Sequence, residues 1–316
     1  MAQEFKAQPM WKVRARLAAR NLRANWGMFA HSKLGPVGLF LIVFFLLFGL
    51  VHPLYLVYRG NDKIYDPVVG FAYDLLPEGN PHPPTLSHPL GTDILGRDIL
   101  GQLMHSTAKA FMLGLIAAGF GVLISTLVGS IAAYFGGFID SVFMRLADVV
   151  MLFPLIAFLV ALSAAIEITL FKLAIILAIL MGFGGTTIIL KSQALTVKVK
   201  PFIEAARVSG GGHFRIILSH IIPNVLPLSF LYMMFGVTTA IFSEAILSYL
   251  GFLNVRMSLG IMIYTANDSG YLIGSRLGTY WYLWLPPGLI ISLLCAGFYF
   301  VGRGLDEVVN PRLRER

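Results

Sequence analysis

Six long apolar runs set the hydrophobic pattern of the chain. Each run lacks Asp, Glu, Lys and Arg over at least the roughly 18 residues that a helix needs to cross a bilayer. Barrel strands would alternate between apolar and polar positions, and lone strands could not satisfy their backbone groups in lipid. The pattern therefore predicts an all-α membrane protein with six transmembrane helices, at residues 34–58, 110–139, 149–166, 173–190, 216–243 and 277–302.

The segments outside these runs differ in kind. From Trp11 to Phe29 apolar residues recur every three or four positions with Lys and Arg between them, which predicts a basic amphipathic helix on the membrane surface within residues 1–33. A disordered basic tail is the alternative reading of this segment. Residues 59–105 hold six prolines, which favours an irregular external loop. Residues 304–316 form a second polar tail.

Composition places the chain in the bilayer. Apolar residues make up 57% of the sequence and charged residues 13%, and the mean hydropathy is +0.77. These values exceed what a soluble chain needs for one core. The single cysteine, Cys295, lies in the last apolar run, so no disulfide can form within the chain.

The distribution of basic residues predicts the orientation in the membrane. With both termini in the cytoplasm, 17 of the 24 Lys and Arg residues lie on the cytoplasmic side, as the positive-inside rule requires. The net charge of +8 is then explained by topology and by contact with anionic lipid. A nucleic-acid partner is not expected.

A polar stretch at residues 88–103, HPLGTDILGRDILGQL, precedes the second apolar run. Thr92 or Asp93 is expected to cap a helix whose first turn also gains from the negative charge of Asp98. Three histidines lie on the predicted external side: His82, His88 and His105. A metal site is not expected there, because these histidines lack acidic or thiol partners at ligand spacing and resemble ordinary loop histidines.

Motifs along the chain resemble a known family in their order and spacing. The family is the C-type permease subunit of bacterial dipeptide, oligopeptide and nickel ABC importers, and the resemblance covers nearly everything after the N-terminal tail. The motifs are HPLGTDxLGRDxL (88–100), AxYFGGxxD (132–140), MRxxDxxxxFP (144–154), EAAxxxG followed by RII and HIxPN (204–224), SEAxLSxLG (243–251) and GxGLxxxxxPRLR (302–314).

This resemblance implies a type I ABC importer permease fold, with a permease core at 106–303 and a cytoplasmic coupling segment at 198–222. It also implies a bacterial or archaeal cell membrane and three kinds of partner: a second, homologous permease in a heterodimer, two cytoplasmic ATPase subunits and an external solute-binding protein. The chain departs from the family pattern at 256–262, where prolines and a Trp are missing, and at 210–212, where three glycines replace one.

The segment 198–222 is polar although it lies between two apolar runs. Pro201 can begin a short helix, Glu204 complements the positive end of that helix, and glycines from Gly210 onward can end it. A loop that merely lies on lipid is the alternative. The family resemblance implies instead that an ATPase groove receives this helix through Glu204, Ala205, Ala206, Arg207 and Gly210.

Catalysis and cofactor binding are not expected of this chain. The sequence contains no GxxxxGK[ST] phosphate loop, so ATP hydrolysis is expected from a partner subunit. Ionisable residues within apolar runs are costly and usually face protein or water. Glu244 is expected either to hydrogen-bond a neighbouring helix or to lie along the substrate path or gate. Asp148 is expected to be a structural acid, with Arg145 as its candidate partner.

The expected function is that of a permease subunit that forms half of a pathway for di- or oligopeptides. The same architecture could instead carry nickel, opines or oligosaccharides. An ATP-independent secondary transporter is the alternative from another class. Such a transporter would need its own ion or proton relay, and it would leave the polar segment 198–222 unexplained.

Overall fold

The computed structural model describes residues 20, 23, 26–59, 63–72 and 79–309. This part of the chain is mostly α-helical and contains no extended β-strand, apart from one isolated bridge between Thr92 and Asp98. The surface helix predicted within residues 1–33 lies largely outside the described residues, although residues 26–31 are helical.

Three helices are long and apolar enough to cross a membrane without a break: α4 (Ile99–Phe135), the continuous stretch His213–Tyr249 that ends in α11, and α14 (Trp281–Val309). Three further apolar segments are pairs of helices bent by 43°, 85° and 43° at short breaks. The described residues thus contain three continuous spans, or up to six if each bent pair is one span. The predicted helical membrane fold is confirmed, and the number six depends on how the pairs are counted.

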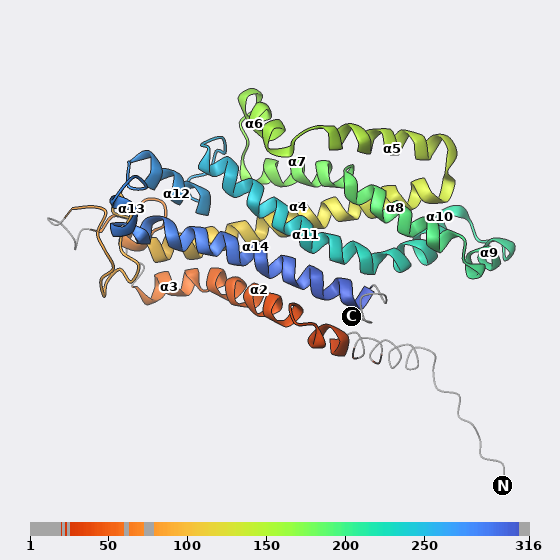
Figure 1. The fold of residues 1–316 in the computed structure, drawn as a ribbon, viewed down its shortest axis with the longest axis horizontal. Coiled ribbons are helices and arrows are strands. Elements are labelled where there is room, and N and C mark those ends of the chain that lie inside the picture. The colour runs from red at the N-terminus through yellow and green to blue at the C-terminus, as the bar shows by residue number, and fades with distance from the viewer. Residues whose placement is uncertain (1–19, 21–22, 24–25, 60–62, 73–78, 310–316) are drawn as a thin grey trace, which may run out of the picture.

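The first bent pair consists of α2 (Gly35–Leu50) and α3 (His52–Tyr58). Pro53 stands in the first turn of α3, where its missing N–H is tolerated but where it interrupts the helix arriving from α2. Figure 1 shows α2 running along α14. The two backbones approach closely, since a Cβ on Gly38 would lie 2.6 Å from the Gly297 carbonyl oxygen.

The long helix α4 lies at the centre of the bundle and packs against α2, α11 and the third bent pair, α7 (Leu170–Gly182) with α8 (Gly185–Lys198). Small residues allow these contacts. A Cβ on Gly114 would lie 2.8 Å from the side chain of Val237 on α11, and one on Gly129 would lie 2.9 Å from the backbone nitrogen of Lys191 on α8. Small residues at helix interfaces are typical of membrane bundles.

The second bent pair consists of α5 (Gly137–Leu152) and α6 (Leu155–Ala165), which meet at 85°. Pro154 stands at the break and cannot continue the hydrogen-bond ladder of α5. The helix begins at Gly137, earlier than the apolar run at 149–166, because Arg145 and Asp148 belong to α5 although they interrupt its hydropathy.

After α8 the chain forms the short helix α9 (Pro201–Val208), then α10 (His213–Ile216), the π-helical segment η3 (Ile217–Ile221) and α11 (Ile222–Tyr249). The span predicted at 216–243 begins slightly earlier and ends later, because the continuous stretch runs from His213 to Tyr249. The π-helical turn before Pro223 accommodates a residue that lacks a backbone N–H.

The two ends of the bundle differ. Figure 1 shows α9 projecting at one end, which we call the α9 end. At the opposite end, which we call the α12 end, lie α12 (Leu259–Asp268), α13 (Arg276–Thr279) and the loop that contains the 3-10 turn η1 (Lys63–Tyr65).

Candidate functional site

The end of α9 is a backbone motif that requires glycine. The N–H of Gly210 donates to the Arg207 carbonyl and the N–H of Gly211 donates to the Ala206 carbonyl, both at 2.9 Å. This pair of bonds is a Schellman motif, and Gly210 has the positive φ of +81° that the motif needs. The glycines therefore end the helix as predicted.

The structure adds a second requirement that the sequence reasoning missed. Space around Gly210 is open, so Gly210 is needed for its φ and not for lack of bulk. Gly211, by contrast, is needed for close approach, because a Cβ there would lie 2.7 Å from the Ala206 carbonyl oxygen. The run of three glycines was the available signal for this position.

One face of α9 is anchored to the bundle. Ile203 is fully buried among apolar residues of α8, α10 and the last turn of α4. Ala206 is half-buried and packs against the same cluster. Ala206 thus contacts the body of its own chain, and the contact with an ATPase that the family resemblance implies for it stays a prediction.

The other face of α9 is exposed. Glu204, Ala205 and Arg207 all lie on this surface. Two large apolar side chains are also exposed in this region, Val208 at the end of α9 by 86% and Phe214 on α10 by 68%. An exposed surface that mixes charged and large apolar side chains is typical of a site that binds another protein.

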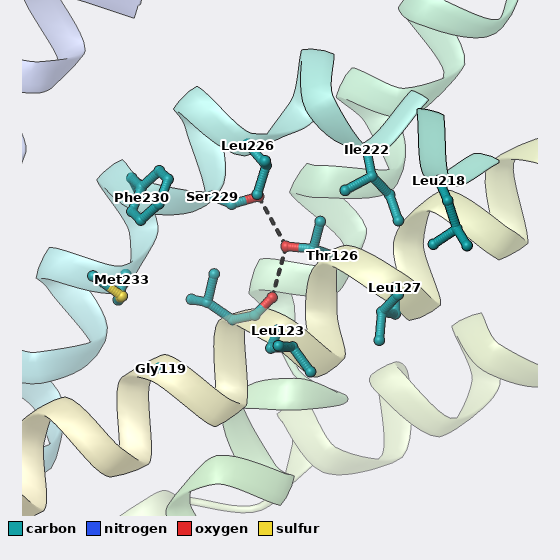
Figure 2. Close-up of a pocket in the computed structure, with 11 residues that line it drawn as sticks. Gly119, Leu123, Thr126, Leu127, Leu218, Ile222, Leu226, Ser229, Phe230 and Met233 are labelled. Atoms are coloured by element: carbon teal, nitrogen blue, oxygen red, sulfur yellow. Dashed lines mark hydrogen bonds between the residues drawn. The ribbon is translucent and has the colours of Figure 1, made fainter. Parts of the chain in front are cut away.

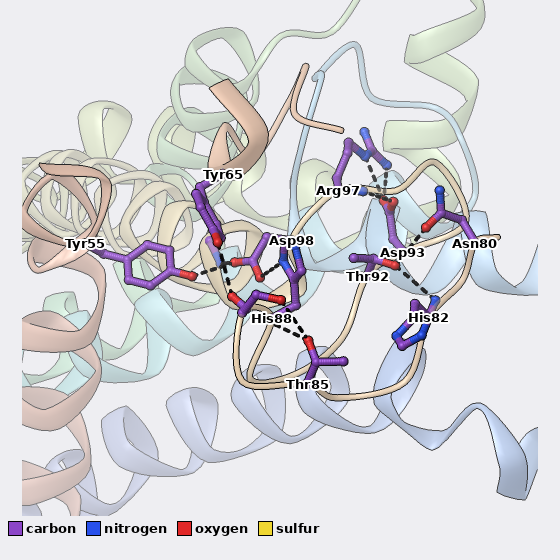
Figure 3. A network of polar contacts seen from close by, with 12 residues as sticks. Tyr55, Tyr65, Asn80, His82, Thr85, His88, Thr92, Asp93, Arg97 and Asp98 are labelled. Atoms are coloured by element: carbon purple, nitrogen blue, oxygen red, sulfur yellow. Dashed lines mark hydrogen bonds and ion pairs between the residues drawn. The ribbon is translucent and has the colours of Figure 1, made fainter. Parts of the chain in front are cut away.

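At the α12 end, Asp98 organises a buried polar network (Figure 3). Its side chain caps α4 by accepting from the Gly101 N–H at 2.7 Å. The same carboxylate lies 2.9 Å from His88 Nδ1 and accepts from the Tyr55 hydroxyl at 3.0 Å. Both His88 and Asp98 are fully buried. The expectation that Thr92 or Asp93 caps this helix is wrong, because Asp98 directly precedes the first helical residue.

Asp93 forms a second buried cluster in the same loop. It accepts from Arg97 Nε at 2.7 Å and from Gln102 Nε2 at 2.8 Å, and it also accepts from the backbone N–H of Arg97. Thr92 bonds the Asn80 side chain at 3.0 Å. Residues 79–98 therefore form a folded cap over the end of the bundle, with their buried charges paired as such groups require.

The histidines divide into different roles. Among the described residues, no group of three or more His, Cys, Asp or Glu could hold a metal ion. His88 is not an ordinary loop histidine, because it is buried against Asp98. His105 lies on α4 rather than in the predicted loop 59–105, and its ring centroid is 5.2 Å from that of His52.

Glu244 is buried on α11, with 2% of its surface exposed, and accepts from the Ser248 hydroxyl at 2.7 Å. A side-chain hydrogen bond also joins Glu244 to Ser258, the N-cap of α12. The bond to a neighbouring helix, one of the two roles expected for Glu244, is therefore present. The turn of α11 around Glu244 packs against the start of α12, where a Cβ on Gly260 would lie 2.7 Å from Ser248 Cβ.

Asp148 is exposed on the surface of α5. Arg145 and Asp148 are both described, and the structure forms no ion pair between them, which corrects the expected pairing. Asp148 lies 11 positions after Gly137 in the sequence, hence about 16 Å along the helix. Apart from exposed Arg145, the exposed side chains around it on α5 are mostly apolar, including Leu152 at 79% exposure.

A cavity of about 310 Å³ lies between α4 and α11 (Figure 2). Its described lining is apolar except for Thr126 and Ser229, whose hydroxyls lie 2.8 Å apart. Since these hydroxyls bond each other, they join the two helices and leave the cavity an apolar surface.

A bundle of apolar helices with a polar segment at one end and a folded cap at the other defines a multi-pass membrane protein. Residues 125–315 match the family described as binding-protein-dependent transport system inner membrane component. The chain belongs to this family, whose members are membrane permease subunits.

Relatives extend the similarity over most of the chain. The chain is 32% identical to the oligopeptide transport system permease protein OppC of Bacillus subtilis (strain 168), over 91% of this chain and 88% of the relative. It is 28% identical to the dipeptide transport system permease protein DppC of the same organism, over 92% and 85%. It is 27% identical to the probable D,D-dipeptide transport system permease protein DdpC of Escherichia coli (strain K12), over 73% and 75%.

Proposed function

We propose that the chain is the transmembrane permease subunit of an ATP-driven importer that carries di- or oligopeptides delivered by an external solute-binding protein. The observation that carries the proposal is α9, a short helix anchored on one face and exposed on the other at one end of a membrane bundle. The names of the relatives support the peptide cargo.

The exposed face of α9 is the proposed docking surface for a cytoplasmic ATPase subunit. Glu204 lies in the first turn of α9, where its charge suits the helix dipole and is available for a charge-assisted contact. Ala205 adds little bulk between Glu204 and the partner. Exposed Val208 and Phe214 supply apolar area that would lose water contact on docking.

The outward side of α5 is the proposed contact with a second, homologous permease. Lipid could cover its apolar residues, but it could not favourably solvate the carboxylate of Asp148 about 16 Å along the helix. A partner subunit or a water-filled pathway between two subunits removes the free-energy cost of exposing this carboxylate to lipid. Asp148 thus supports a heterodimer with the pathway between its halves, and a role of Glu244 along that pathway remains our proposal.

The orientation of the chain in the membrane follows from the assignment of α9 as the ATPase docking surface. The α9 end and both termini lie in the cytoplasm, with the cap at 79–98 and α12 outside, as the excess of basic residues on the α9 side favours. The folded cap then presents a fixed surface to the solute-binding protein. The domain limits proposed from the sequence, with a core at 106–303 and a coupling segment at 198–222, remain part of the proposal, although α4 begins at Ile99 and α14 continues to Val309.

The proposal is tested by reconstitution in proteoliposomes with and without the other subunits. The chain purified alone is expected to hydrolyse no ATP, whereas the complete complex takes up labelled trialanine only with ATP and the solute-binding protein present. Robust ATP hydrolysis by the isolated chain, or trialanine uptake without the ATPase subunits, would contradict the proposed function.

A further inference from the structure

Tyr134, in the last turns of α4, contacts the turn after α9 on two sides. Its hydroxyl lies 2.9 Å from Nδ1 of His213, the first residue of α10. The guanidinium carbon of Arg207, near the end of α9, lies 5.3 Å from the centroid of the Tyr134 ring. Tyr134 itself is buried, with 6% of its surface exposed. One buried tyrosine on α4 therefore contacts both sides of the glycine turn, through a hydrogen bond to His213 and a cation–π contact with Arg207.

The same end of α4 is tied to α8. Lys198 Nζ donates to the Ala133 carbonyl at 2.8 Å, which satisfies one of the last carbonyls of the helix with a positive charge. Just beyond, Lys191 Nζ lies 2.5 Å from an Asp140 carboxylate oxygen at the start of α5. The end of α4 is thus held between α8 and the turn that follows α9.

We propose that Tyr134 is the positioning residue that passes displacement of α9 to α4 during transport, an inference that rests on the proposed function. Without it, α9 would act on the bundle through Ile203 and through its covalent links to α8 and α10. The contacts of Tyr134 with Arg207 and His213 make α9 and its glycine turn move together with the end of α4. Since α4 packs against α2, α7, α8 and α11, a movement at Tyr134 reaches most of the bundle.

The first test needs no transport. In the purified chain in lipid nanodiscs, hydrogen exchange is measured at the amides of Ser209, Gly210 and Gly211, which are bonded within the turn. Tyr134→Phe keeps the ring beneath Arg207 and removes only the hydroxyl, so exchange is expected to quicken about fivefold, as for the loss of one hydrogen bond. Thr196→Val, on exposed α8 surface, is the matched control and is expected to leave exchange unchanged. Unchanged exchange in Tyr134→Phe would overturn the inference.

The second test uses the complete complex and measures trialanine taken up per ATP hydrolysed. Tyr134→Phe and His213→Ala are each expected to lower this ratio several-fold while ATPase subunits co-purify at the wild-type level. The double variant is expected to lose little more, because both changes break the same bond. A residue that is merely structural would reduce the yield of complex and leave the ratio unchanged.

The outcomes separate the two claims. If wild-type complex fails to couple ATP hydrolysis to uptake, the proposed function is wrong and the transport role of Tyr134 is wrong with it. If wild-type complex couples normally and both single variants keep its ratio, only the role of Tyr134 is overturned.

Discussion

Gly210 and Gly212 belong to the same triplet, yet their backbones make different demands. Gly210 has a φ of +81°, which costs side-chain-bearing residues energy, although no atom would meet its Cβ within 4 Å. Gly212 is the N-cap of α10 with a φ of −65° and equally open surroundings. Any residue can adopt the conformation of Gly212, so the two positions form a matched pair.

Gly210→Ala is therefore expected to destabilise the turn after α9 by about 1–2 kcal/mol, the cost of left-handed backbone in a residue with a Cβ. The amount of ATPase that co-purifies and the rate of uptake should both fall. Gly212→Ala is the control and should keep both near the wild-type level. Equal effects of the two substitutions on co-purification would show that backbone conformation does not govern this site.

Asp98 is expected to matter for stability more than any exposed acid. Asp98→Ala removes a helix cap, worth about 1 kcal/mol, and removes the buried carboxylate that lies against His88 Nδ1, a loss of about 1–3 kcal/mol for a buried polar contact. The thermal midpoint of the purified chain in detergent should drop markedly. Asp268→Ala, at the exposed C-terminal end of α12, should leave it unchanged or slightly raised. An unchanged midpoint in Asp98→Ala would refute this view of the cap.

At the level of elements, α12 is held against α11 by backbone proximity. A Cβ on Gly260 would overlap the Ala245 carbonyl oxygen and would lie 2.7 Å from Ser248 Cβ, next to buried Glu244. Ser258 caps α12 by accepting from the Ile261 N–H at 3.3 Å. The short helix α12 therefore sits at a fixed place over the turn of α11 that carries Glu244.

Gly260→Ala is expected to push α12 away from α11 at a cost of about 1–3 kcal/mol, as for overpacking of a filled core. Uptake stimulated by the solute-binding protein should decline, whereas association with the ATPase should persist because α9 lies at the opposite end. Gly278→Ala, in open space on α13, is the control. Should ATPase association fail while stimulated uptake survives, α12 would not have the external role assigned to it.

The sequence predicted elements better than their limits. Hydropathy located the apolar segments because it reports which residues the bilayer can accept, and it does not report where hydrogen-bonded helix begins. Helices α4, α5 and the His213–Tyr249 stretch all start before their apolar runs, since turns that contain polar residues continue the same hydrogen-bond ladder. The bends at Val51 and near Phe183 do not show in the hydropathy, although Pro53 marks the first of them in the sequence.

The candidate site was predicted in part for a similar reason. Local signals placed Pro201 and Glu204 correctly at the start of α9 and Gly210 in the turn that ends it, because helix ends are determined by neighbouring residues. Tyr134 could not be assigned to the coupling segment from the sequence, since it lies 79 positions from His213 and meets it only in the folded bundle.

Over the whole molecule, the two functional surfaces lie at opposite ends of the bundle (Figure 1). Ser209→Cys at the α9 end and Leu86→Cys in the cap, each in a Cys295→Ser background, are expected to react with an impermeant thiol reagent from opposite sides. Both positions are exposed, Leu86 at 99%. In sealed right-side-out vesicles only Leu86→Cys should be labelled, and labelling of both would exclude the proposed topology.

The central claim is that α9 receives an ATPase subunit, and cross-linking in intact complexes tests it most directly. A photoreactive group is attached to Val208→Cys, 86% exposed on α9, and to Leu86→Cys as the control at the other end, both with Cys295→Ser. The account predicts that illumination joins the ATPase subunit to the chain from position 208 and not from position 86. Absence of any ATPase product from position 208, in complexes that still take up trialanine, would contradict it.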